Sequence, residues 1–153
     1  ILADRIAVLG HSLGGTTTLA LTRKDCCRDL RVRASVLFAP GPIDLFPTLF
    51  GTDSIASGPP TLILQGTEDP IINVASSRAI FAQLEPPKLL VVITGADHSD
   101  ALEVAAGAPL DELATVSQRA IVAFLDQQFH GAERALAVTL ATLGAEGHAI
   151  ERQ

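Results

Sequence analysis

Residues Gly10–Gly15 read Gly-His-Ser-Leu-Gly-Gly and match the pattern G-x-S-x-G around Ser12. A serine hydroxyl is a weak nucleophile until a tight strand-to-helix turn exposes it and a base accepts its proton. Glycines two residues before and after the serine let the strand and the helix approach each other without collision. The backbone N–H of Leu13 would then serve as one donor to a developing oxyanion. This segment, called the elbow below, therefore indicates a serine nucleophile.

A glycine-rich turn between a strand and a helix can also cradle a phosphate group. Such loops carry G-x-x-x-x-G-K-[ST] or G-x-G-x-x-G, and residues 10–15 fit neither pattern. Serine chemistry in a turn of this type needs an acid and then a histidine later in the chain, each on a loop after a strand. The elbow therefore indicates serine chemistry only if the chain also supplies these two partners.

Asp69 lies in Gly-Thr-Glu-Asp-Pro, just beyond one apolar run, and His98 lies in Gly-Ala-Asp-His-Ser, just beyond the next. Loops that follow parallel strands meet at one edge of the sheet, which is the edge that also carries Ser12. Asp69 is therefore the expected acid. Glu68 is its local rival, and Asp44 is another because some enzymes carry the acid one strand earlier.

The chain has four histidines, and only His98 has the required order and position. His11 flanks the serine and is expected to help bind substrate, whereas His130 and His148 lie beyond the last expected strand. His98 is therefore the expected base. No metal ligand set and no organic cofactor are expected for this chemistry.

The elements that must position these residues are visible as alternating apolar runs and helical patterns. Strands buried on both faces are expected at 5–9, 34–38, 61–65 and 88–93, and helices at 14–23, 74–84, 113–129 and 132–143. Strand alternating with helix implies an α/β fold with a parallel sheet, right-handed crossovers and flanking helices. Beyond residue 143 two glycines predict a frayed tail.

The amino-acid composition and net charge indicate which classes of binding partner are disfavoured. The 153 residues are 48% hydrophobic and 18% charged with a net charge of −6, so the chain can bury a core. The charge disfavours nucleic acid and anionic membranes as partners, and no apolar run reaches the roughly 18 residues of a membrane span. Cys26 and Cys27 are adjacent, so we expect no bridge between them and no metal site.

The chain resembles the α/β-hydrolase superfamily, in particular its serine-dependent lipase-like, dienelactone-hydrolase-like and polyester-hydrolase-like branches. The resemblance rests on residues 4–15, 66–69 and 95–98 and extends to about residue 129. It implies that the four strands correspond to strands five to eight of that fold. Residues 1–130 would be a partial catalytic domain and 131–153 a C-terminal helix and tail of the same domain.

The resemblance also implies what is missing. The family's first four strands and its second oxyanion donor have no counterpart, so we expect a fragment or partial gene model that is poorly active alone. The strand at 5–9 would then expose an unpaired apolar edge. The sequence opens directly into this strand, so any export signal, and with it the compartment, is left open.

These features favour a serine hydrolase that cleaves a small carboxylic ester through an acyl-enzyme. Dienelactone hydrolases proper use cysteine, so Ser12 favours ordinary ester hydrolysis. An acyltransferase, amidase or peptidase with the same three residues is the alternative within enzymes. A catalytically inactive binding domain is the alternative from another class.

Overall fold

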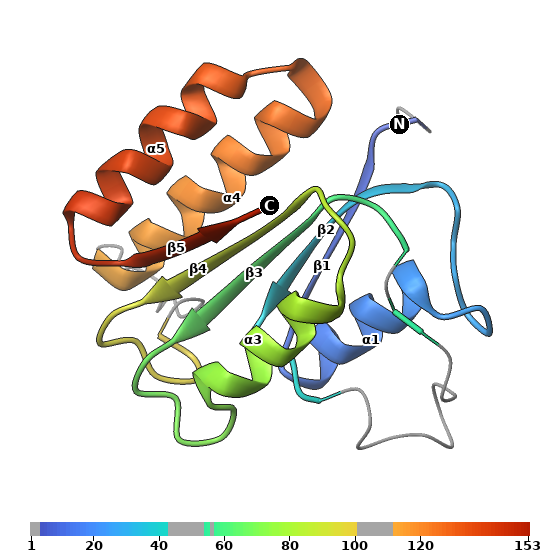
Figure 1. Cartoon of the computed structure of the whole chain (residues 1–153), viewed down its shortest axis with the longest axis horizontal. Coiled ribbons are helices and arrows are strands. Elements are labelled where there is room, and N and C mark those ends of the chain that lie inside the picture. The colour runs from blue at the N-terminus through green and yellow to red at the C-terminus, as the bar shows by residue number, and fades with distance from the viewer. Residues whose placement is uncertain (1–3, 43–53, 56, 101–111) are drawn as a thin grey trace, which may run out of the picture.

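The computed structural model describes residues 4–42, 54–55, 57–100 and 112–153. Within these ranges one sheet has five strands in the order β1-β2-β3-β4-β5 (Figure 1). The strands are β1 (Ile6–His11), β2 (Val32–Phe38), β3 (Thr61–Gly66), β4 (Lys88–Ile93) and β5 (Ala149–Arg152). The helices are α1 (Leu13–Arg23), α3 (Val74–Gln83), α4 (Glu112–His130) and α5 (Glu133–Ala145). The expected α/β class with flanking helices is confirmed.

Strands β1 to β4 run parallel, so their carboxyl ends share one edge of the sheet. The loops that leave this edge lead to the elbow helix and to the segments that carry Asp69 and His98. β2 and β3 pair from Ser35 opposite Thr61 onward. β3 and β4 pair as far as Gly66 opposite Ile93. The parallel sheet is therefore the frame on which the expected site residues are placed.

The expectation of a frayed tail was wrong. Residues 149–152 form β5, which pairs antiparallel with β4, so the sheet is mostly rather than wholly parallel. Gly147 turns the chain with φ of 96°, a conformation that glycine adopts without steric strain. Beyond the strand, Gln153 and Lys88 exchange two backbone hydrogen bonds of 2.9 and 3.1 Å. The tail is ordered because it covers the open edge of a buried strand.

Helices cover both faces of the sheet: α1 and α3 lie on one face, and α4 and α5 lie on the other (Figure 1). Alternate strand residues point into the two apolar layers between sheet and helices. The first layer includes Leu19, Leu37, Ile63, Ile80, Phe81 and Leu90. The second includes Val36, Leu62, Val91, Ile93, Phe124 and Leu140. Burial on both faces explains why β3 and β4 are apolar almost without interruption.

β1 differs from the other parallel strands because it lies at the edge of the sheet. No described residue pairs with its outer side, and none of its six residues is fully buried. Leu9 is 49% exposed. The expectation of a strand buried on both faces was therefore wrong for β1.

The expectation for the cysteines was also wrong. Cys26 and Cys27 form a disulfide with each other in an exposed turn after α1. Both cysteines are exposed, and Cys27 N donates to Lys24 O (3.0 Å) within the turn.

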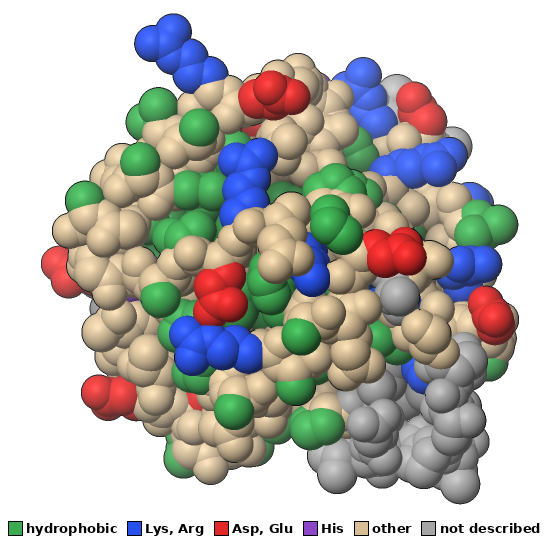
Figure 2. All heavy atoms as spheres, in the orientation of Figure 1, with side chains coloured by type: hydrophobic (Ala, Val, Ile, Leu, Met, Phe, Trp, Pro, Cys, Tyr) green, Lys and Arg blue, Asp and Glu red, His purple; other side chains and the backbone are tan. Residues whose placement is uncertain are grey.

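The surface carries charges of both signs. On the face drawn in Figure 2, the Lys and Arg side chains are interspersed with Asp and Glu rather than gathered into a patch. Among the described helices, none combines the length and the apolar character that crossing a bilayer requires.

Candidate active site

Ser12 lies between β1 and α1 in a strained backbone conformation. Its φ of 53° and ψ of −120° fall outside the regions that non-glycine residues favour. The Ser12 N–H donates to Phe38 O on the neighbouring strand (2.9 Å), and Ser12 O accepts from Thr16 N (3.1 Å). The fold therefore forces the serine into a sharp turn at the carboxyl edge of the sheet, as the sequence pattern predicts.

The glycines of the elbow have different roles. A Cβ on Gly10 would overlap the carbonyl of Gly14, and one on Gly15 would come within 3.2 Å of Phe38 O. Gly14 itself has open space around its Cα. The expected close approach of strand and helix is therefore confirmed at Gly10, whereas Gly15, rather than Gly14, is the second crowded position.

Asp69 and His98 meet across two loops. His98 Nδ1 lies 2.7 Å from Asp69 Oδ2, and the Asp69 side chain is fully buried. The other carboxylate oxygen, Oδ1, accepts from the backbone N–H groups of Ile71 (2.8 Å) and Ile72 (2.7 Å). Oδ2 also accepts from the side-chain amide of Gln65 (3.1 Å). Donors therefore surround the carboxylate on both oxygens.

These donors determine the protonation state of the pair. Burial by itself would raise the pKa of Asp69, but the N–H groups of Ile72, His98, Ile71 and Gln65 outweigh it and lower that pKa below its usual value. An ionised carboxylate only accepts hydrogen bonds, so the proton between the two groups belongs to His98 Nδ1. A ring that carries its only proton on Nδ1 has Nε2 left as an acceptor.

Backbone contacts hold the acid loop and the histidine loop together. Glu68 N donates to Ala96 O (2.9 Å), and the Thr67 hydroxyl accepts from Gly95 N (2.9 Å). A Cβ on Gly66 would overlap the carbonyl of Ala96, so the two loops touch where β3 ends. Main-chain packing therefore holds the acid loop beside the histidine loop.

A tight turn within the histidine loop involves Asp97. Its Oδ1 accepts from Ser99 N (2.7 Å) and Asp100 N (2.8 Å), and these N–H groups lower the pKa of the Asp97 carboxyl. The side chain is exposed and makes its hydrogen bonds within its own turn. Asp97 therefore shapes the loop that carries His98.

His11 connects the elbow to the histidine loop. Its Nε2 lies 2.7 Å from the backbone oxygen of His98, and the two imidazole rings are 4.7 Å apart between centroids. The residue before the serine thus contacts the expected base. No hydrogen bond joins the Ser12 hydroxyl to His98. The structure brings Asp69, His98 and His11 together, and Ser12 directly follows His11 in the chain.

The other expected residues are placed as follows. Leu13 is 55% exposed, and because it is the first residue of α1 its N–H has no acceptor within the helix. Glu68 is exposed, and Asp44 lies outside the described residues. His130 contacts Asp126 on α4, and His148 accepts from Thr94 N (3.2 Å). Substrate contact by His11 stays a prediction.

Sequence reasoning gave no part in the site to Gln65 or Thr67. The available signal for Gln65 was a large polar amide directly after the apolar residues Leu62–Leu64. No comparable signal marks Thr67, because a threonine in a turn is usual. The Thr67 contact joins the loops after β3 and β4, whereas Gln65 contacts the loop and the helix that follow its own strand.

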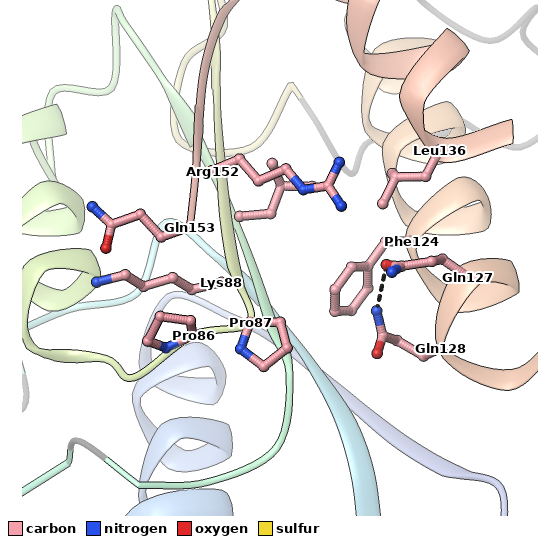
Figure 3. A pocket seen from close by; sticks show the side chains of 10 residues that line it. Pro86, Pro87, Lys88, Phe124, Gln127, Gln128, Leu136, Arg152 and Gln153 are labelled. Atoms are coloured by element: carbon pink, nitrogen blue, oxygen red, sulfur yellow. Dashed lines mark hydrogen bonds between the residues drawn. The ribbon is translucent and has the colours of Figure 1, made fainter. Parts of the chain in front are cut away.

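A cavity of about 440 Å³ lies at the opposite end of the sheet, near the start of β4 (Figure 3). Its walls include Pro87 and Phe124, with the Arg152 side chain at its rim. Lys88 begins β4 and His98 follows its end, so this cavity is separate from the candidate site. In the described ranges no cluster of three or more His, Cys, Asp or Glu side chains could hold a metal ion.

The fold of this chain is similar to that of many solved structures, among them two enzymes. One is MGS-M1, an alpha/beta hydrolase enzyme from a Medee basin deep-sea metagenome library, with TM-score 0.60 and 19% identity over 81% of this chain and 54% of that chain. The other is Est2, a thermophilic esterase from the Planctomycetes species Thermogutta terrifontis, with TM-score 0.60 and 19% identity over 81% and 55%. No family model and no curated protein matches.

The chain spans about half the length of both solved structures. At 19% sequence identity, the similarity to these structures is evidence for a shared fold alone. The five-stranded, mostly parallel sheet with helices on both faces corresponds to part of an α/β-hydrolase fold.

Proposed function

We propose that this chain carries the catalytic residues of a serine hydrolase that cleaves carboxylic esters through an acyl-enzyme. The observation that carries the proposal is the 2.7 Å contact between Asp69 Oδ2 and His98 Nδ1, in a loop that His11 ties to the elbow. A carboxylate on Nδ1 orients the imidazole and leaves Nε2 to accept the proton of Ser12.

The proposed reaction has two halves. Ser12 Oγ forms a bond to the ester carbonyl carbon while its proton passes to His98 Nε2, and the carbonyl oxygen becomes an oxyanion near the Leu13 N–H. The carbon–oxygen bond to the leaving group then breaks, and His98 protonates the departing alcohol. Water, deprotonated by His98, attacks the acyl-enzyme and releases the acid and Ser12.

The mechanism requires Ser12 Oγ and His98 Nε2 to approach within hydrogen-bonding distance. Catalytic hydrogen bonds are often long without substrate and tighten in the Michaelis complex. Ser12 is partly exposed, and exposed side chains change rotamer within picoseconds to nanoseconds. The strained main chain at Ser12 restricts where this hydroxyl can go, which favours attack from one direction.

Ester hydrolysis is favoured over the other reactions that the same residues support. A serine nucleophile and the fold shared with a protein described as an esterase both support it. The lipase-like, dienelactone-hydrolase-like and polyester-hydrolase-like branches are part of this proposal, with a small ester as substrate. The three residues supply nucleophile, base and acid, so the proposed reaction uses no metal or organic cofactor.

A fluorophosphonate probe tests the proposal because it reacts only with an activated serine. The experiment uses the longest natural polypeptide that contains this sequence. Mass spectrometry of its peptides identifies the residue that the probe has modified. We expect labelling at Ser12 and hydrolysis of a short p-nitrophenyl ester. Ser12→Ala should abolish labelling and lower the ester rate on the order of 10⁵-fold.

Thr17→Ala is the matched control, because Thr17 lies on the exposed side of α1 and its hydroxyl bonds only Leu13 O. This variant should keep both activities. Ester turnover that survives Ser12→Ala would overturn the proposal, and absence of any labelling would favour a binding domain. Faster turnover of an amide, or transfer to an added alcohol, would instead indicate an amidase or an acyltransferase.

A further inference from the structure

Gln65 is the last side chain of β3 before the acid loop, and it is 1% exposed. A fully buried amide must find partners for both its donor and its acceptor, because an unsatisfied polar group in the core is destabilising. Its neighbours on β3 are apolar side chains that serve the core. The amide itself points to the segment that contains Asp69.

The partners of Gln65 leave one orientation for the amide. Nε2 faces three oxygens that accept hydrogen bonds: Ile72 O (2.8 Å), Asp69 Oδ2 (3.1 Å) and Gly66 O (3.2 Å). Oε1 faces the hydroxyl of Ser77, which donates to it at 2.7 Å. Rotating the amide by 180° would place its oxygen against two carbonyls and a carboxylate, where no proton is available.

Ser77 anchors this amide from the opposite side. It lies on α3 and is fully buried, so its hydroxyl is held by the packing of a helix rather than by a loop. The hydrogen bonds therefore run from α3 through Ser77 and Gln65 to Asp69, and from Asp69 to His98. Each link is at most 3.1 Å long.

Asp69 Oδ2 is shared between Gln65 and His98. Two hydrogen bonds to the same oxygen fix both the position of that atom and the side from which the imidazole can approach. The Gln65 N–H also favours the ionised form of the carboxylate, which is the form that keeps the proton on His98 Nδ1. The same amide nitrogen binds Ile72 O, and Ile72 N binds Asp69 Oδ1.

We infer that Gln65, oriented by Ser77, is a positioning residue that aims the Asp69 carboxylate at His98. The inference rests on the proposed function, because aiming the carboxylate matters only if His98 acts as a base. Gln65 is buried and its amide bonds Asp69 directly, so its effect on the reaction passes through Asp69.

The test uses the rate of fluorophosphonate labelling and the kcat for ester hydrolysis. Gln65→Met keeps the length of the side chain but removes its N–H donors, and we expect both rates to fall on the order of 10- to 100-fold, as for other hydrogen bonds that orient a functional group. Ser77→Ala should give a smaller loss of the same kind. KM should change little, since neither residue lines the substrate.

Ser117→Ala is the matched control, because Ser117 is an equally buried serine whose hydroxyl faces only Leu113 O, within α4. It should keep full activity. Thermal unfolding and circular dichroism identify the variants that remain folded. If Gln65→Met does not fold, Ser77→Ala, which leaves Gln65 and Asp69 intact, carries the test.

A double-mutant cycle separates positioning from a general structural effect. In an Asp69→Asn background, Gln65→Met and Ser77→Ala should cause little further loss, because their action passes through the carboxylate. Additive losses would overturn the inference, as would folded variants with unchanged kcat. Normal activity of Asp69→Asn alone would instead overturn the proposed function, so the two failures are distinguishable.

The proton between His98 and Asp69 gives an independent readout. A hydrogen bond from Nδ1–H to a buried carboxylate produces a strongly downfield proton signal in NMR spectra. We expect this signal to shift or broaden in Gln65→Met and Ser77→Ala and to remain in Ser117→Ala. An unchanged signal in both site variants would contradict the inference.

Discussion

At the scale of single residues, Asp69 shows how a buried carboxylate can stay ionised. Four donors compensate for its burial, and they come from a backbone turn, a strand side chain and the imidazole. The ionised state of Asp69 therefore depends on its surroundings rather than on its residue type alone. Glu68 is next to it in the sequence but is exposed and does not contact His98.

The lowered pKa of Asp69 predicts a pH-dependent contribution to stability. Because the folded-state pKa lies below the unfolded value of about 4, the ionised carboxylate stabilises the fold above that value. The contribution is lost as the pH falls through the folded-state pKa. We therefore expect Asp69→Asn to lower the free energy of unfolding more at about pH 6.5 than near pH 3.

Urea unfolding at the two pH values measures this difference. Asp97→Asn gives a comparison at an exposed carboxylate whose pKa is also lowered. Its effect on stability should be smaller, because solvent screens an exposed group. An equal loss of stability from Asp69→Asn at both pH values would contradict the prediction.

A second prediction at this scale concerns His11. If its main role is to hold the His98 backbone, His11→Ala should lower kcat on the order of 10-fold, the loss expected from one hydrogen bond of about 1.4 kcal/mol. His11→Gln, which can still donate to His98 O, should keep more of the activity. Steady-state kinetics with one ester measures both variants. A rise in KM at constant kcat would instead support the expected role in substrate binding.

At the scale of elements, the elbow depends on how closely β1 and α1 approach. Gly10 and Gly14 are equivalent in the sequence pattern, but only Gly10 is crowded in the structure. The pattern G-x-S-x-G therefore predicts the turn without distinguishing the two glycines. The distinction arises from the packing of the strand against the helix.

This difference gives a prediction with a built-in control. Gly10→Ala should destabilise the protein by about 1–3 kcal/mol, because the added methyl group overlaps the Gly14 carbonyl and the helix must move. Gly14→Ala should be neutral or stabilise by about 0.5–1 kcal/mol, since alanine is the better helix former and space is free. Urea unfolding of both variants measures the difference, and equal effects would show that the crowding at Gly10 is unimportant.

At the scale of the whole molecule, the two edges of the sheet differ. β5 covers the outer edge of β4, and Arg78 on α3 forms an ion pair with Glu151 on β5 at 2.7 Å. The outer edge of β1 has no partner in the described part of the chain. An open edge of this kind is a template for pairing with another strand.

The open edge predicts self-association of the 153-residue polypeptide. Its apparent mass in size-exclusion chromatography with light scattering should rise with concentration. Leu9→Lys should reduce this association, because a charged side chain on an edge strand opposes pairing and Leu9 is 49% exposed. Val138→Lys, at a similarly exposed apolar position on α5, is the control and should have little effect. A monomer at all concentrations would contradict the prediction.

The sequence by itself determined the α/β class, the bounds of the buried strands to within two residues, and the elbow around Ser12. These features depend on local chemistry: apolar runs, turn residues and a short motif with a physical requirement at each position. The location of Ser12, Asp69 and His98 at one edge of the sheet also followed, because parallel strands place their following loops at one edge.

Tertiary structure alone decided the rest. β5 forms because a buried neighbour has an open edge, and Gln65 reaches Asp69 because β3, its loop and α3 converge. Such contacts join residues that are distant in the chain or separated by a turn, so no local pattern encodes them. Their geometry depends on how sheet and helices pack, and that packing is a property of the folded molecule as a whole.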